Sequence, residues 1–504
     1  MTAKTIMIQG TASDAGKTLF AVALCRIFRN RGFKVAPFKS QNMSLNSFVT
    51  SNGKEIARSQ VIQALAAKIE PIVEHNPILL KPKGNNKSQI ILMGNPYIDY
   101  EVGEYYDSII IELIPAIKRS ISFLMENNEI VVIEGAGSPA EINLNDREIA
   151  NMFVANLVQS PVLLIADIDR GGVFASIYGT LELLKPNEKD LIHGFVINKF
   201  RGDIELLIPG IQKIENFVKK KCLGVIPYIN NLYLPSEDSL GIKDTNQGGK
   251  INIFIIKFPK ISNFTDFEPL SWHPDVNLSY IEYPSQIKEP DLIILPGTKN
   301  TVSDLNWLKV GGFESLLKTY QEKGVLIIGI CGGYQMLGEK IIDHSIEGEF
   351  DENYDGLKLL PISTIFKEYQ KITKQVIVKI TGLANFKGEI IKGYEIHMGE
   401  VIFHSPIKSI FNSLEKTNDN ISPSIGITNH SQTIIGTFIH GLFENDGFRN
   451  KLIDLLLKKK DLKSNSNKKY EFNNKINENL EKLAQIVESN VDIDEILKIM
   501  GIES

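Results

Sequence analysis

The chain has 504 residues and a formal net charge of −5, with 43% hydrophobic and 23% charged residues. A single hydrophobic core seldom grows beyond roughly 250–300 residues, so this length predicts two or three domains. The small negative charge gives no reason to expect a nucleic-acid partner. No apolar run approaches the ~20 residues that cross a bilayer, so we expect no membrane association. The three cysteines are far apart and lack Cys-x-x-Cys spacing, which argues against a disulfide or zinc framework and favours a reducing cytoplasm.

The first half of the chain alternates short apolar runs with amphipathic stretches. This alternation is typical of a parallel sheet covered by helices. The predicted strands are 5–9, 34–38, 130–133, 162–166, 194–198 and 224–227. Helical patterns are found at 19–31 and 55–69. We therefore expect a first α/β domain over residues 1–236.

A second α/β domain is expected over residues 251–445, after a polar linker at 237–250. Its predicted strands are 251–258, 291–295 and 325–330, with β-like runs at 375–380 and 433–439. Residues 446–504 are expected to form a helical tail with a solvated linker at 458–469 and a last helix at about 477–500. The predicted fold class is α/β, with two domains that each contain a mostly parallel sheet.

A glycine-rich stretch follows the first predicted strand and reads Gly10-Thr11-Ala12-Ser13-Asp14-Ala15-Gly16-Lys17-Thr18. A turn of this composition directs backbone N–H groups at phosphate oxygens, and the next helix adds the positive end of its dipole. Lys17 would reach the β- and γ-phosphates of a nucleotide, and the Thr18 hydroxyl would bind Mg²⁺. The residues predicted to bind ATP here are Gly10, Thr11, Asp14, Gly16, Lys17 and Thr18.

Polar side chains also follow the later strands of this domain. They are Lys39, Glu134, the pair Asp167 and Asp169, and Asn198. Ligands of open α/β sheets bind at the carboxyl ends of the strands, where these residues would gather. Any one of them could belong to an ordinary surface loop, but clusters at successive strand ends favour a single ligand site. The segment that starts at Asn198 is interpreted as contacting the nucleotide base.

Cys331 lies between a predicted strand and a predicted helix, in the sequence Gly329-Ile330-Cys331-Gly332-Gly333. A tight turn of this kind exposes a nucleophile above the sheet, and a helix N-terminus lowers a thiol pKa. The alternative is a small buried hydrophobic residue. We assign that alternative to Cys25 and Cys222, which lack flanking glycines, and we predict that Cys331 is a nucleophile.

A cysteine nucleophile needs a base and an oxyanion site. His440 closes a β-like run and is the favoured base, whereas His397 is the competing candidate. The loop Leu295-Pro296-Gly297-Thr298 follows a predicted strand. The backbone N–H groups of Gly297 and Gly332 are therefore predicted to be the oxyanion donors.

The phosphate loop is one residue longer than the common P-loop and resembles that of dethiobiotin synthetase and its relatives. Those proteins make an acyl phosphate from ATP and a carboxylate. The resemblance implies that Lys39 stabilises the phosphate and the attacking carboxylate. It also implies that Glu134 binds Mg²⁺ together with Thr18, in keeping with the preference of Mg²⁺ for oxygen ligands.

The residues around Cys331 and His440 resemble class I glutamine amidotransferases. The shared features are the Pro-Gly loop, the cysteine elbow and the late histidine. That class usually has a glutamate two residues after the histidine, where this chain has Leu442. Glu444 is near but off the pattern. The residue that orients His440 is therefore left unassigned, with a backbone carbonyl or another carboxylate as candidates.

The two domains together resemble the corrinoid amidotransferase family, most specifically over 38–46 and 137–152. This resemblance implies ATP- and glutamine-dependent amidation of the b, d, e and g carboxylates of adenosylcobyrinic acid a,c-diamide in cobalamin biosynthesis. Asp146 and Arg147 are the candidate residues that orient the corrinoid. Besides ATP, Mg²⁺ and L-glutamine, no tightly held prosthetic group is expected, and a homodimer is considered.

Three alternatives stay open on the sequence alone. The sister enzyme that amidates the a and c carboxylates of cobyrinic acid would share both domains. A P-loop regulatory protein could carry an inactive glutaminase-like domain, although an intact Cys331 and His440 count against it. A ligase that uses no ammonia, like dethiobiotin synthetase, would leave residues 251–445 unexplained.

Overall fold

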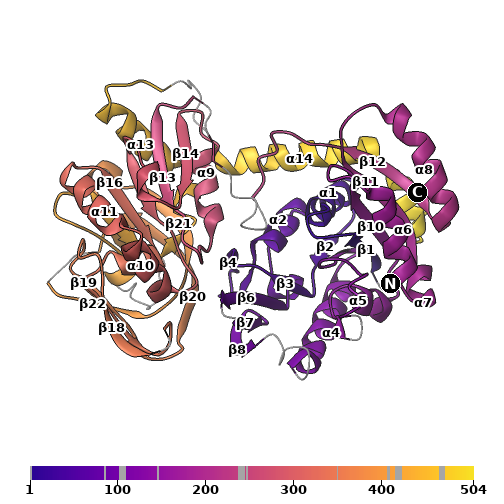
Figure 1. Cartoon of the computed structure of the whole chain (residues 1–504), viewed down its shortest axis with the longest axis horizontal. Helices are drawn as coiled ribbons and strands as arrows, with labels where there is room; N and C mark the ends of the chain where they lie inside the picture. Colours follow the sequence, from indigo (N-terminus) through magenta and orange to yellow (C-terminus); the bar gives the residue numbers. More distant parts are fainter. Residues whose placement is uncertain are drawn as a thin grey trace. The chain divides into compact units, whose positions relative to one another are not determined.

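The computed structural model describes residues 3–84, 87–101, 109–144, 147–235, 244–245, 248–348, 350–405, 409–414, 423–464 and 471–503. The chain divides into two compact units (Figure 1). Unit 1 comprises Met1–Ser44, Ile56–Pro235 and Asn474–Ser504. Unit 2 comprises Leu45–Glu55 and Ser236–Asn473.

Unit 1 is built on a six-stranded sheet whose strand order is β12-β11-β10-β1-β9-β2. All neighbouring strands are parallel. The strands are β1 (Lys4–Gly10), β2 (Val35–Phe38), β9 (Ile130–Glu134), β10 (Val162–Asp167), β11 (Ile192–Phe200) and β12 (Lys221–Pro227). All five residues of β9 are buried, because helices cover both faces of the sheet and make such strands read as continuous apolar runs. The predicted α/β class is thereby confirmed.

The helices of unit 1 are α1 (Lys17–Asn30), α2 (Arg58–Ala66), α4 (Ile110–Asn127), α5 (Met152–Val158), α6 (Val173–Leu183), α7 (Pro186–Leu191) and α8 (Ile204–Val218). Helix α1 packs against β1, β2 and β9. Helices α6 and α8 pack against each other, and α6 also packs against β10 while α8 packs against β12. A second, small sheet has the order β3-β6-β7-β8 and was not predicted. Its strands are β3 (Gln41–Met43), β6 (Ile78–Gly84), β7 (Lys87–Leu92) and β8 (Asn95–Glu101). A 3-10 turn, η1 (Val73–His75), completes this unit.

The C-terminal residues contribute to both units instead of forming a separate tail. Helix α13 (Asp446–Lys459) buries one apolar face in the core of unit 2. Helices α14 (Phe472–Asn490) and α15 (Ile493–Ile499) belong mainly to unit 1. There Glu481 of α14 pairs with Arg26 of α1 at 3.3 Å, and Val491 forms a β-bridge with Gly224. Most of the predicted linker at 237–250 lies outside the described residues. So do residues 465–469 of the predicted linker at 458–469.

Unit 2 contains a six-stranded sheet of order β14-β13-β15-β16-β25-β24, parallel except for the edge strand β24. Its strands are β13 (Ile251–Ile256), β14 (Val276–Ile281), β15 (Leu292–Leu295), β16 (Leu326–Ile330), β24 (Gly426–Thr428) and β25 (Ile434–Thr437). Alternate residues of β13 enter two separate core clusters, Ile253 on one face and Phe254 on the other. The alternation shows that the sheet has a hydrophobic core on each side.

The helices of unit 2 besides α13 are α9 (Glu268–Ser271), α10 (Thr301–Val310), α11 (Phe313–Glu322) and α12 (Gly332–Met336). Two further sheets have the orders β18-β17-β19-β22 and β23-β20-β21-β26. Their strands are β17 (Lys340–His344), β18 (Asp351–Asp355), β19 (Ile362–Phe366), β20 (Lys371–Ile380), β21 (Ile390–Met398), β22 (Glu400–Phe403), β23 (Phe411–Ser413) and β26 (Ile439–His440). The remaining elements are β4 (Ser47–Val49), β5 (Glu55–Ala57), and the 3-10 turns η5 (Phe264–Phe267), η6 (Pro284–Gln286), η7 (Ala384–Phe386), η8 (Pro423–Ile425) and η9 (Leu442–Glu444).

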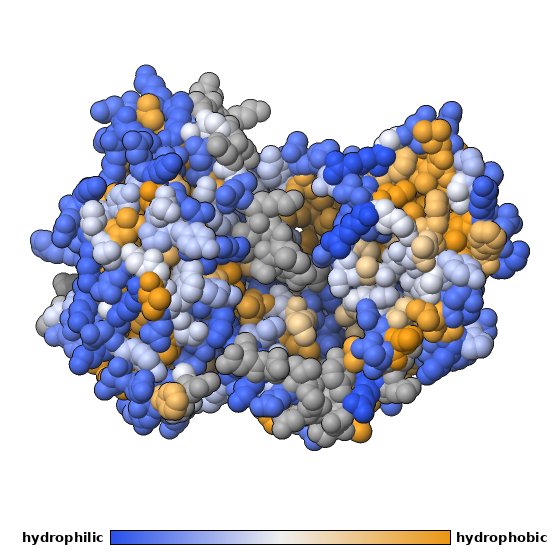
Figure 2. All heavy atoms as spheres, viewed as in Figure 1, coloured by the Kyte–Doolittle hydropathy of each residue, from blue (hydrophilic) through white to orange (hydrophobic). Residues whose placement is uncertain are grey.

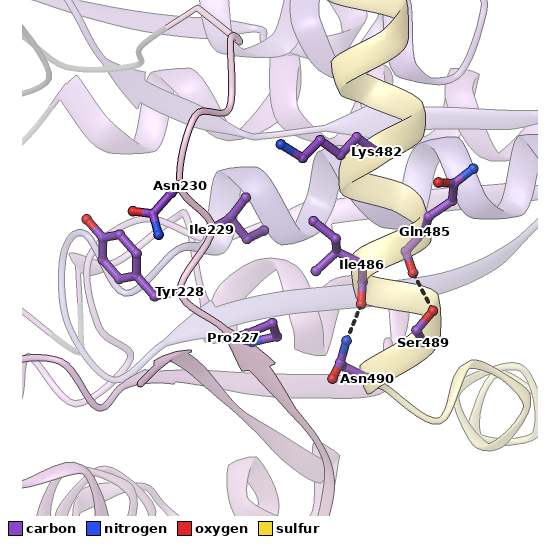
Figure 3. Close-up of a pocket in the computed structure, with 9 residues that line it drawn as sticks. All are labelled: Pro227, Tyr228, Ile229, Asn230, Lys482, Gln485, Ile486, Ser489 and Asn490. Atoms are coloured by element: carbon purple, nitrogen blue, oxygen red, sulfur yellow. Dashed lines mark hydrogen bonds between the residues drawn. The ribbon is translucent and has the colours of Figure 1, made fainter. Parts of the chain in front are cut away.

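The surface of unit 1 carries a cluster of exposed hydrophobic side chains on α8. Leu206 and Phe217 are 83% and 71% exposed, and Figure 2 shows hydrophobic residues gathered over this helix at the upper right. Elsewhere in unit 1, a shallow groove of about 470 Å³ runs between α14 and the segment after β12 (Figure 3). Asn490 and Ser489 in this groove hydrogen-bond to carbonyls of their own helix. No helix among the described residues is long and apolar enough to span a membrane.

Candidate functional site

The glycine-rich loop of unit 1 connects β1 to α1, as the sequence predicted. Thr11 N–H donates to the Ile165 carbonyl at 3.0 Å, which fixes the start of the loop on the neighbouring strand β10. Gly16 caps α1 with a φ of 105°, and a Cβ there would lie 2.1 Å from the Asn198 amide nitrogen. Only glycine fits such a position. Asn198 donates to the Ala15 carbonyl at 2.9 Å, so it supports the loop from β11.

Lys17 is the first residue of α1 and its side chain bends back over the loop. Its Nζ donates to the carbonyls of Ala12 at 3.0 Å and Gly137 at 2.9 Å. Gly137 follows β9, so the lysine joins the ends of two neighbouring strands. The ammonium group is therefore held at the carboxyl edge of the sheet, where phosphate groups bind in folds of this class.

Glu134 ends β9 and is the centre of a buried polar cluster. It is fully buried, accepts a hydrogen bond from Thr18 Oγ1 at 2.7 Å, and pairs with Lys39 Nζ at 2.8 Å. Gln63 of α2 also donates to this carboxylate. Thr18, Lys39 and Glu134 were each predicted from separate parts of the sequence, and the fold brings them together. Gln63 was not predicted, because a glutamine within an amphipathic helix carries no distinguishing signal.

The remaining strand ends supply an ionic network beside the loop. Lys199 bridges the Asp14 carbonyl at 2.6 Å and the Asp167 carboxylate at 2.7 Å. Arg170 pairs with the Asp14 carboxylate at 3.2 Å. Asp169 instead pairs with Arg201 at 2.9 Å, on the solvent side. Asp14 is thus held by two basic groups from the strand ends of β10 and β11.

The candidate corrinoid-binding residues are only partly described. Asp146 lies outside the described residues, and Arg147 forms a backbone hydrogen bond from its N–H to the Leu144 carbonyl. The neighbouring Glu148 is half-buried and accepts hydrogen bonds from the N–H groups of Ala150 and Asn151, just before α5, and from Phe153 N in its first turn at 3.2 Å. Burial raises the pKa of Glu148, and these N–H groups oppose that shift. Glu148 therefore caps a helix, which accounts for part of this motif in structural terms.

In unit 2, Cys331 occupies the turn between β16 and α12 with a φ of 52°, in the left-handed region. Its N–H donates to the Thr437 carbonyl at 2.9 Å, and its Sγ contacts the Ile396 carbonyl at 3.6 Å. A non-glycine residue in this conformation is held there by the surrounding structure, a feature that clusters at functional sites. Cys25, by contrast, is fully buried in α1, and burial raises its pKa far above the usual range. Burial also raises the pKa of Cys222, to about 11.

His440 is paired with Asp266, a residue that the sequence analysis did not identify. The Nδ1 atom of His440 lies 2.6 Å from Asp266 Oδ2, and the Gly441 N–H donates to Asp266 Oδ1 at 3.0 Å. Both side chains are almost fully buried. Asp266 therefore supplies the orienting carboxylate where Leu442 departs from the class I pattern. The available signal was a lone aspartate between Phe264 and Phe267, which predicts a buried carboxylate in need of a partner.

The surroundings of His440 favour its protonated form. Burial alone would lower the pKa of His440, but the Asp266 carboxylate and the adjacent Cys331 outweigh burial and raise that pKa from 6.5 to about 10. The other ring nitrogen, Nε2, is buried and has no hydrogen-bond partner among the described residues. The imidazole is thus fixed on one side and available on the side that faces the cysteine.

The predicted oxyanion loop lies against both catalytic candidates. A Cβ added to Gly297 would lie 3.2 Å from His440 Cε1, and one added to Gly332 would lie 2.6 Å from Thr298 Cγ2. The Pro296 carbonyl accepts the Gly333 N–H at 3.1 Å, which joins this loop to the cysteine turn. The loop after β15 and the start of α12 therefore meet beside Cys331, and the paired N–H donors of Gly297 and Gly332 stay a prediction.

His397, the competing base, has different partners. Its Nε2 lies 3.3 Å from Glu395 Oε2, and its ring stacks on Phe438 with centroids 3.6 Å apart. Burial raises the pKa of Glu395, but His397 and Lys374 lower it by more, so the net shift is downward. The pairing with Glu395 gives His397 a structural role in β21 and leaves His440 as the base that the geometry supports.

Comparisons with known proteins match both units. The family model described as "CobQ/CobB/MinD/ParA nucleotide binding domain" matches residues 6–240, and "CobB/CobQ-like glutamine amidotransferase domain" matches residues 252–448. The first match implies that unit 1 binds a nucleotide. Among solved structures, PurLQS from Thermotoga maritima covers 41% of this chain and 99% of its own at 18% identity, with a TM-score of 0.32.

Curated relatives match the chain from end to end. Cobyric acid synthase from Clostridium botulinum (strain Loch Maree / Type A3) is 47% identical and covers 99% of each chain. Probable cobyric acid synthase from Methanosarcina mazei is 44% identical and covers 100% of each chain. Cobyric acid synthase from Listeria monocytogenes serotype 4a is 45% identical over 99% of this chain and 96% of its own. At this identity and coverage, the chain belongs to the cobyric acid synthase family.

Proposed function

We propose that this chain uses ATP and glutamine to amidate the b, d, e and g carboxylates of adenosylcobyrinic acid a,c-diamide in cobalamin biosynthesis. The relatives' name, cobyric acid synthase, supports the reaction. The observation that carries the proposal is the buried Asp266–His440 pair beside Cys331, in a chain that also holds the Lys17 and Glu134 cluster. Few chemistries require a nucleotide site and a cysteine nucleophile in one protein.

In unit 2, the Cys331 thiolate attacks the side-chain amide carbon of glutamine. The carbonyl oxygen becomes an oxyanion, which the N–H groups of Gly297 and Gly332 stabilise. The tetrahedral intermediate collapses as His440 donates its proton to the leaving nitrogen, which departs as ammonia. Asp266 keeps the imidazolium oriented and stabilises its charge throughout this step.

The remaining glutamyl thioester is cleaved by water. His440, now neutral, removes a proton from the water that attacks the thioester carbon, and the Cys331 thiolate leaves. Glutamate is released, and the cysteine and the histidine return to their starting protonation states. One glutamine and one water thus yield one glutamate, one ammonia and one proton, which the new carboxyl group releases.

In unit 1, a substrate carboxylate oxygen attacks the γ-phosphorus of ATP, and ADP leaves with the electron pair of the broken P–O bond. Charge accumulates on the transferring phosphoryl group, so positioned cations provide the stabilisation. Lys17 holds the phosphates, and Lys39 faces the attacking carboxylate. Ammonia then attacks the acyl phosphate carbon, inorganic phosphate leaves, and the amide forms with loss of a proton.

The residues of unit 1 fit a Mg²⁺ ion. Thr18 Oγ1 and Glu134 Oε1 are oxygen donors 2.7 Å apart at the edge of the sheet. No group of three or more carboxylate, histidine or cysteine side chains that could hold a metal occurs among the described residues. This agrees with Mg²⁺, which binds through one or two protein ligands and substrate phosphates. When bound, it would neutralise charge on the phosphates.

We further propose that the protein acts in the cytoplasm as a homodimer. Two free cysteines that are at least half-buried and a third in the active site fit a reducing compartment. The exposed hydrophobic side chains of α8 support a self-association surface in unit 1. Light scattering of the purified protein would measure the molecular mass and decide between monomer and dimer.

The test is to incubate the protein with ATP, glutamine and adenosylcobyrinic acid a,c-diamide and to follow the corrinoid by mass spectrometry. Each amidation replaces a hydroxyl by an amino group, so the mass should fall by about one unit per step and stop after four. Activity on cobyrinic acid but not on its a,c-diamide would instead identify the sister reaction. Absence of glutamine hydrolysis would favour a regulatory protein with an inactive second domain.

A further inference from the structure

The stretch Leu45–Glu55 belongs to unit 2, although in sequence it interrupts unit 1. It begins directly after Ser44, a few residues beyond Lys39 of the phosphate site. The segment 38–46, among the most specific stretches of the sequence, spans this junction. Lys39 accounts for one end of that stretch. The contacts of Asn46 and Ser47 in unit 2 account for the other end.

The first contact holds the backbone that carries Asp266. The Thr265 hydroxyl donates to Asn46 Oδ1 at 2.8 Å, and the Asn263 N–H donates to the Leu45 carbonyl at 3.3 Å. Asn46 is fully buried and Thr265 is 4% exposed, so this hydrogen bond is shielded from water and its loss is costly. Thr265 immediately precedes Asp266, whose carboxylate orients His440.

The second contact holds the ring that covers His440. Tyr394 O–H donates to the Ser47 carbonyl at 2.8 Å, and the Asn263 amide donates to the same carbonyl at 3.1 Å and to the tyrosine oxygen at 3.0 Å. The Tyr394 ring stacks on the imidazole of His440, with centroids 5.4 Å apart and planes at 17°. Ser47 therefore anchors the ring that limits rotation of the histidine.

The rest of the segment is fixed to strands β20 and β21. Phe48 packs edge-on against Tyr394 at 5.2 Å, and Val49 joins the same small apolar cluster. Farther along, the Thr373 hydroxyl donates to the Gly53 carbonyl at 2.9 Å. Glu55 forms a buried ion pair with Lys371. These contacts hold Asn46 and Ser47 in place without touching Asp266 or His440.

We propose that Asn46 and Ser47 are positioning residues of the glutaminase site: they hold His440 through Thr265–Asp266 on one side and through Tyr394 on the other. The inference rests on the proposed glutaminase activity of unit 2. None of these groups touches the reacting atoms, and each acts through the orientation of the imidazole. One short stretch of sequence thus serves the phosphate site through Lys39 and the thiol site through Asn46 and Ser47.

The test uses full-length variants that remove single hydrogen bonds. Thr265→Val deletes the hydroxyl that reaches Asn46 and keeps the side-chain shape, while Thr265→Ser keeps the hydroxyl. Tyr394→Phe deletes the hydrogen bond to Ser47 and keeps the stacked ring. Thr373→Val is the matched control, because it releases the same segment at Gly53, away from His440. Glutamine hydrolysis is measured from pH 6 to 11, with ammonia-dependent amidation as an independent readout of unit 1.

Thr265→Val and Tyr394→Phe should each lower kcat for glutamine about 10-fold, with KM nearly unchanged. Their alkaline limb of kcat should move to lower pH, because a His440 ring that is displaced relative to Asp266 has its imidazolium form stabilised less. Thr265→Ser should restore both values, and Thr373→Val should change neither. Wild-type kcat and alkaline limb in both Thr265→Val and Tyr394→Phe would overturn the inference. Absence of glutamine hydrolysis in the unaltered protein would instead overturn the proposed function.

Discussion

The phosphate site of unit 1 and the thiol site of unit 2 differ in how the protein satisfies their charged groups. In unit 1, Lys17 is held by two carbonyls, and Lys39 and Thr18 both contact Glu134. In unit 2, Asp266 holds one nitrogen of His440, while the other nitrogen has no partner among the described residues. The phosphate site must therefore exchange internal partners for ligand groups, whereas the thiol site is already arranged for proton transfer.

The two sites therefore differ in whether the free energy of ligand binding is needed to rearrange the protein's own contacts. On the proposed mechanism, separating Lys39 from the fully buried Glu134 would cost free energy that contacts to the bound nucleotide offset. The thiol site needs no such exchange, because the geometry around His440 is preorganised.

The largest expected effect is on Cys331, because it is the proposed nucleophile of glutamine hydrolysis. Cys331→Ala should lower glutamine hydrolysis by roughly 10⁴-fold or more. Amidation supported by ammonium chloride should persist, since unit 1 is unaltered. Cys222→Ala is the matched control and should retain glutaminase activity. Measurable glutamine-dependent amidation by the Cys331→Ala protein would contradict the assignment.

The next effect tests the phosphate site. Lys17→Met keeps the length of the side chain and removes its charge, so ATP-dependent amidation should fall by roughly 10³-fold with either nitrogen source. Basal glutamine hydrolysis, measured without ATP, should stay near the wild-type rate because unit 2 is intact. ADP release and glutamate release, followed in parallel, separate the two activities. Equal losses in both would show that the sites are not separable.

Asp266→Asn tests whether the Asp266 carboxylate stabilises the protonated form of His440. The amide keeps the shape of the carboxylate but cannot stabilise an imidazolium, so kcat for glutamine should fall by about 10²–10³-fold. With Asp266 present, the pKa of His440 is about 10, so the rate should fall only as pH rises through that value. Without the carboxylate, the pH at which kcat falls should move toward neutral. If kcat still falls at about pH 10 in Asp266→Asn, the raised pKa belongs to another group.

The same pair predicts a pH dependence of stability. His440 titrates at about 10 in the folded protein, against 6.5 for the unperturbed side chain. A raised folded pKa means that the stabilisation is fully present below pH 6.5 and is lost as pH rises through 10. The Tm difference between the unaltered protein and Asp266→Asn should therefore be largest near pH 6 and shrink as pH rises toward 10. A difference that grows with pH would contradict the ion pair.

The sequence predicted well those features that follow from local pattern. Continuous apolar runs located the strands of the unit 1 sheet and β13, β15, β16 and β25 of the unit 2 sheet, since strands buried on both faces are mostly apolar. Strands β14 and β24 were not predicted; β14 contains Asn277 and Ser279, which interrupt its apolar pattern. The motif around Lys17 located the phosphate loop, because a tight turn and a cradle of N–H groups require glycine at fixed spacing. Glu134 and Lys39 were found for a related reason: each directly follows an apolar strand.

The features that the sequence did not reveal depend on contacts between distant segments. Asp266 and His440 are far apart in the chain, and no periodicity links them. Nor does the sequence predict that Leu45–Glu55 belongs to unit 2, because a short polar stretch after Lys39 is typical of a loop of the first domain. The C-terminal helices were predicted as helices, but an amphipathic pattern does not specify which core receives its apolar face.

The smallest expected effect concerns α14, which returns to unit 1. Glu481→Gln removes the ion pair with Arg26, whose side chain is 1% exposed while that of Glu481 is 39% exposed. Because the carboxylate is partly solvated and the amide can still accept a hydrogen bond, the cost should be only about 0.5–1 kcal/mol. Both tryptophans, Trp272 and Trp307, lie in unit 2. The variant should therefore shift the unfolding transition seen by circular dichroism and leave the tryptophan fluorescence transition in place. An equal shift in both signals would mean that the two units unfold in a single transition. The two sites would then not differ in the stability of the units that carry them.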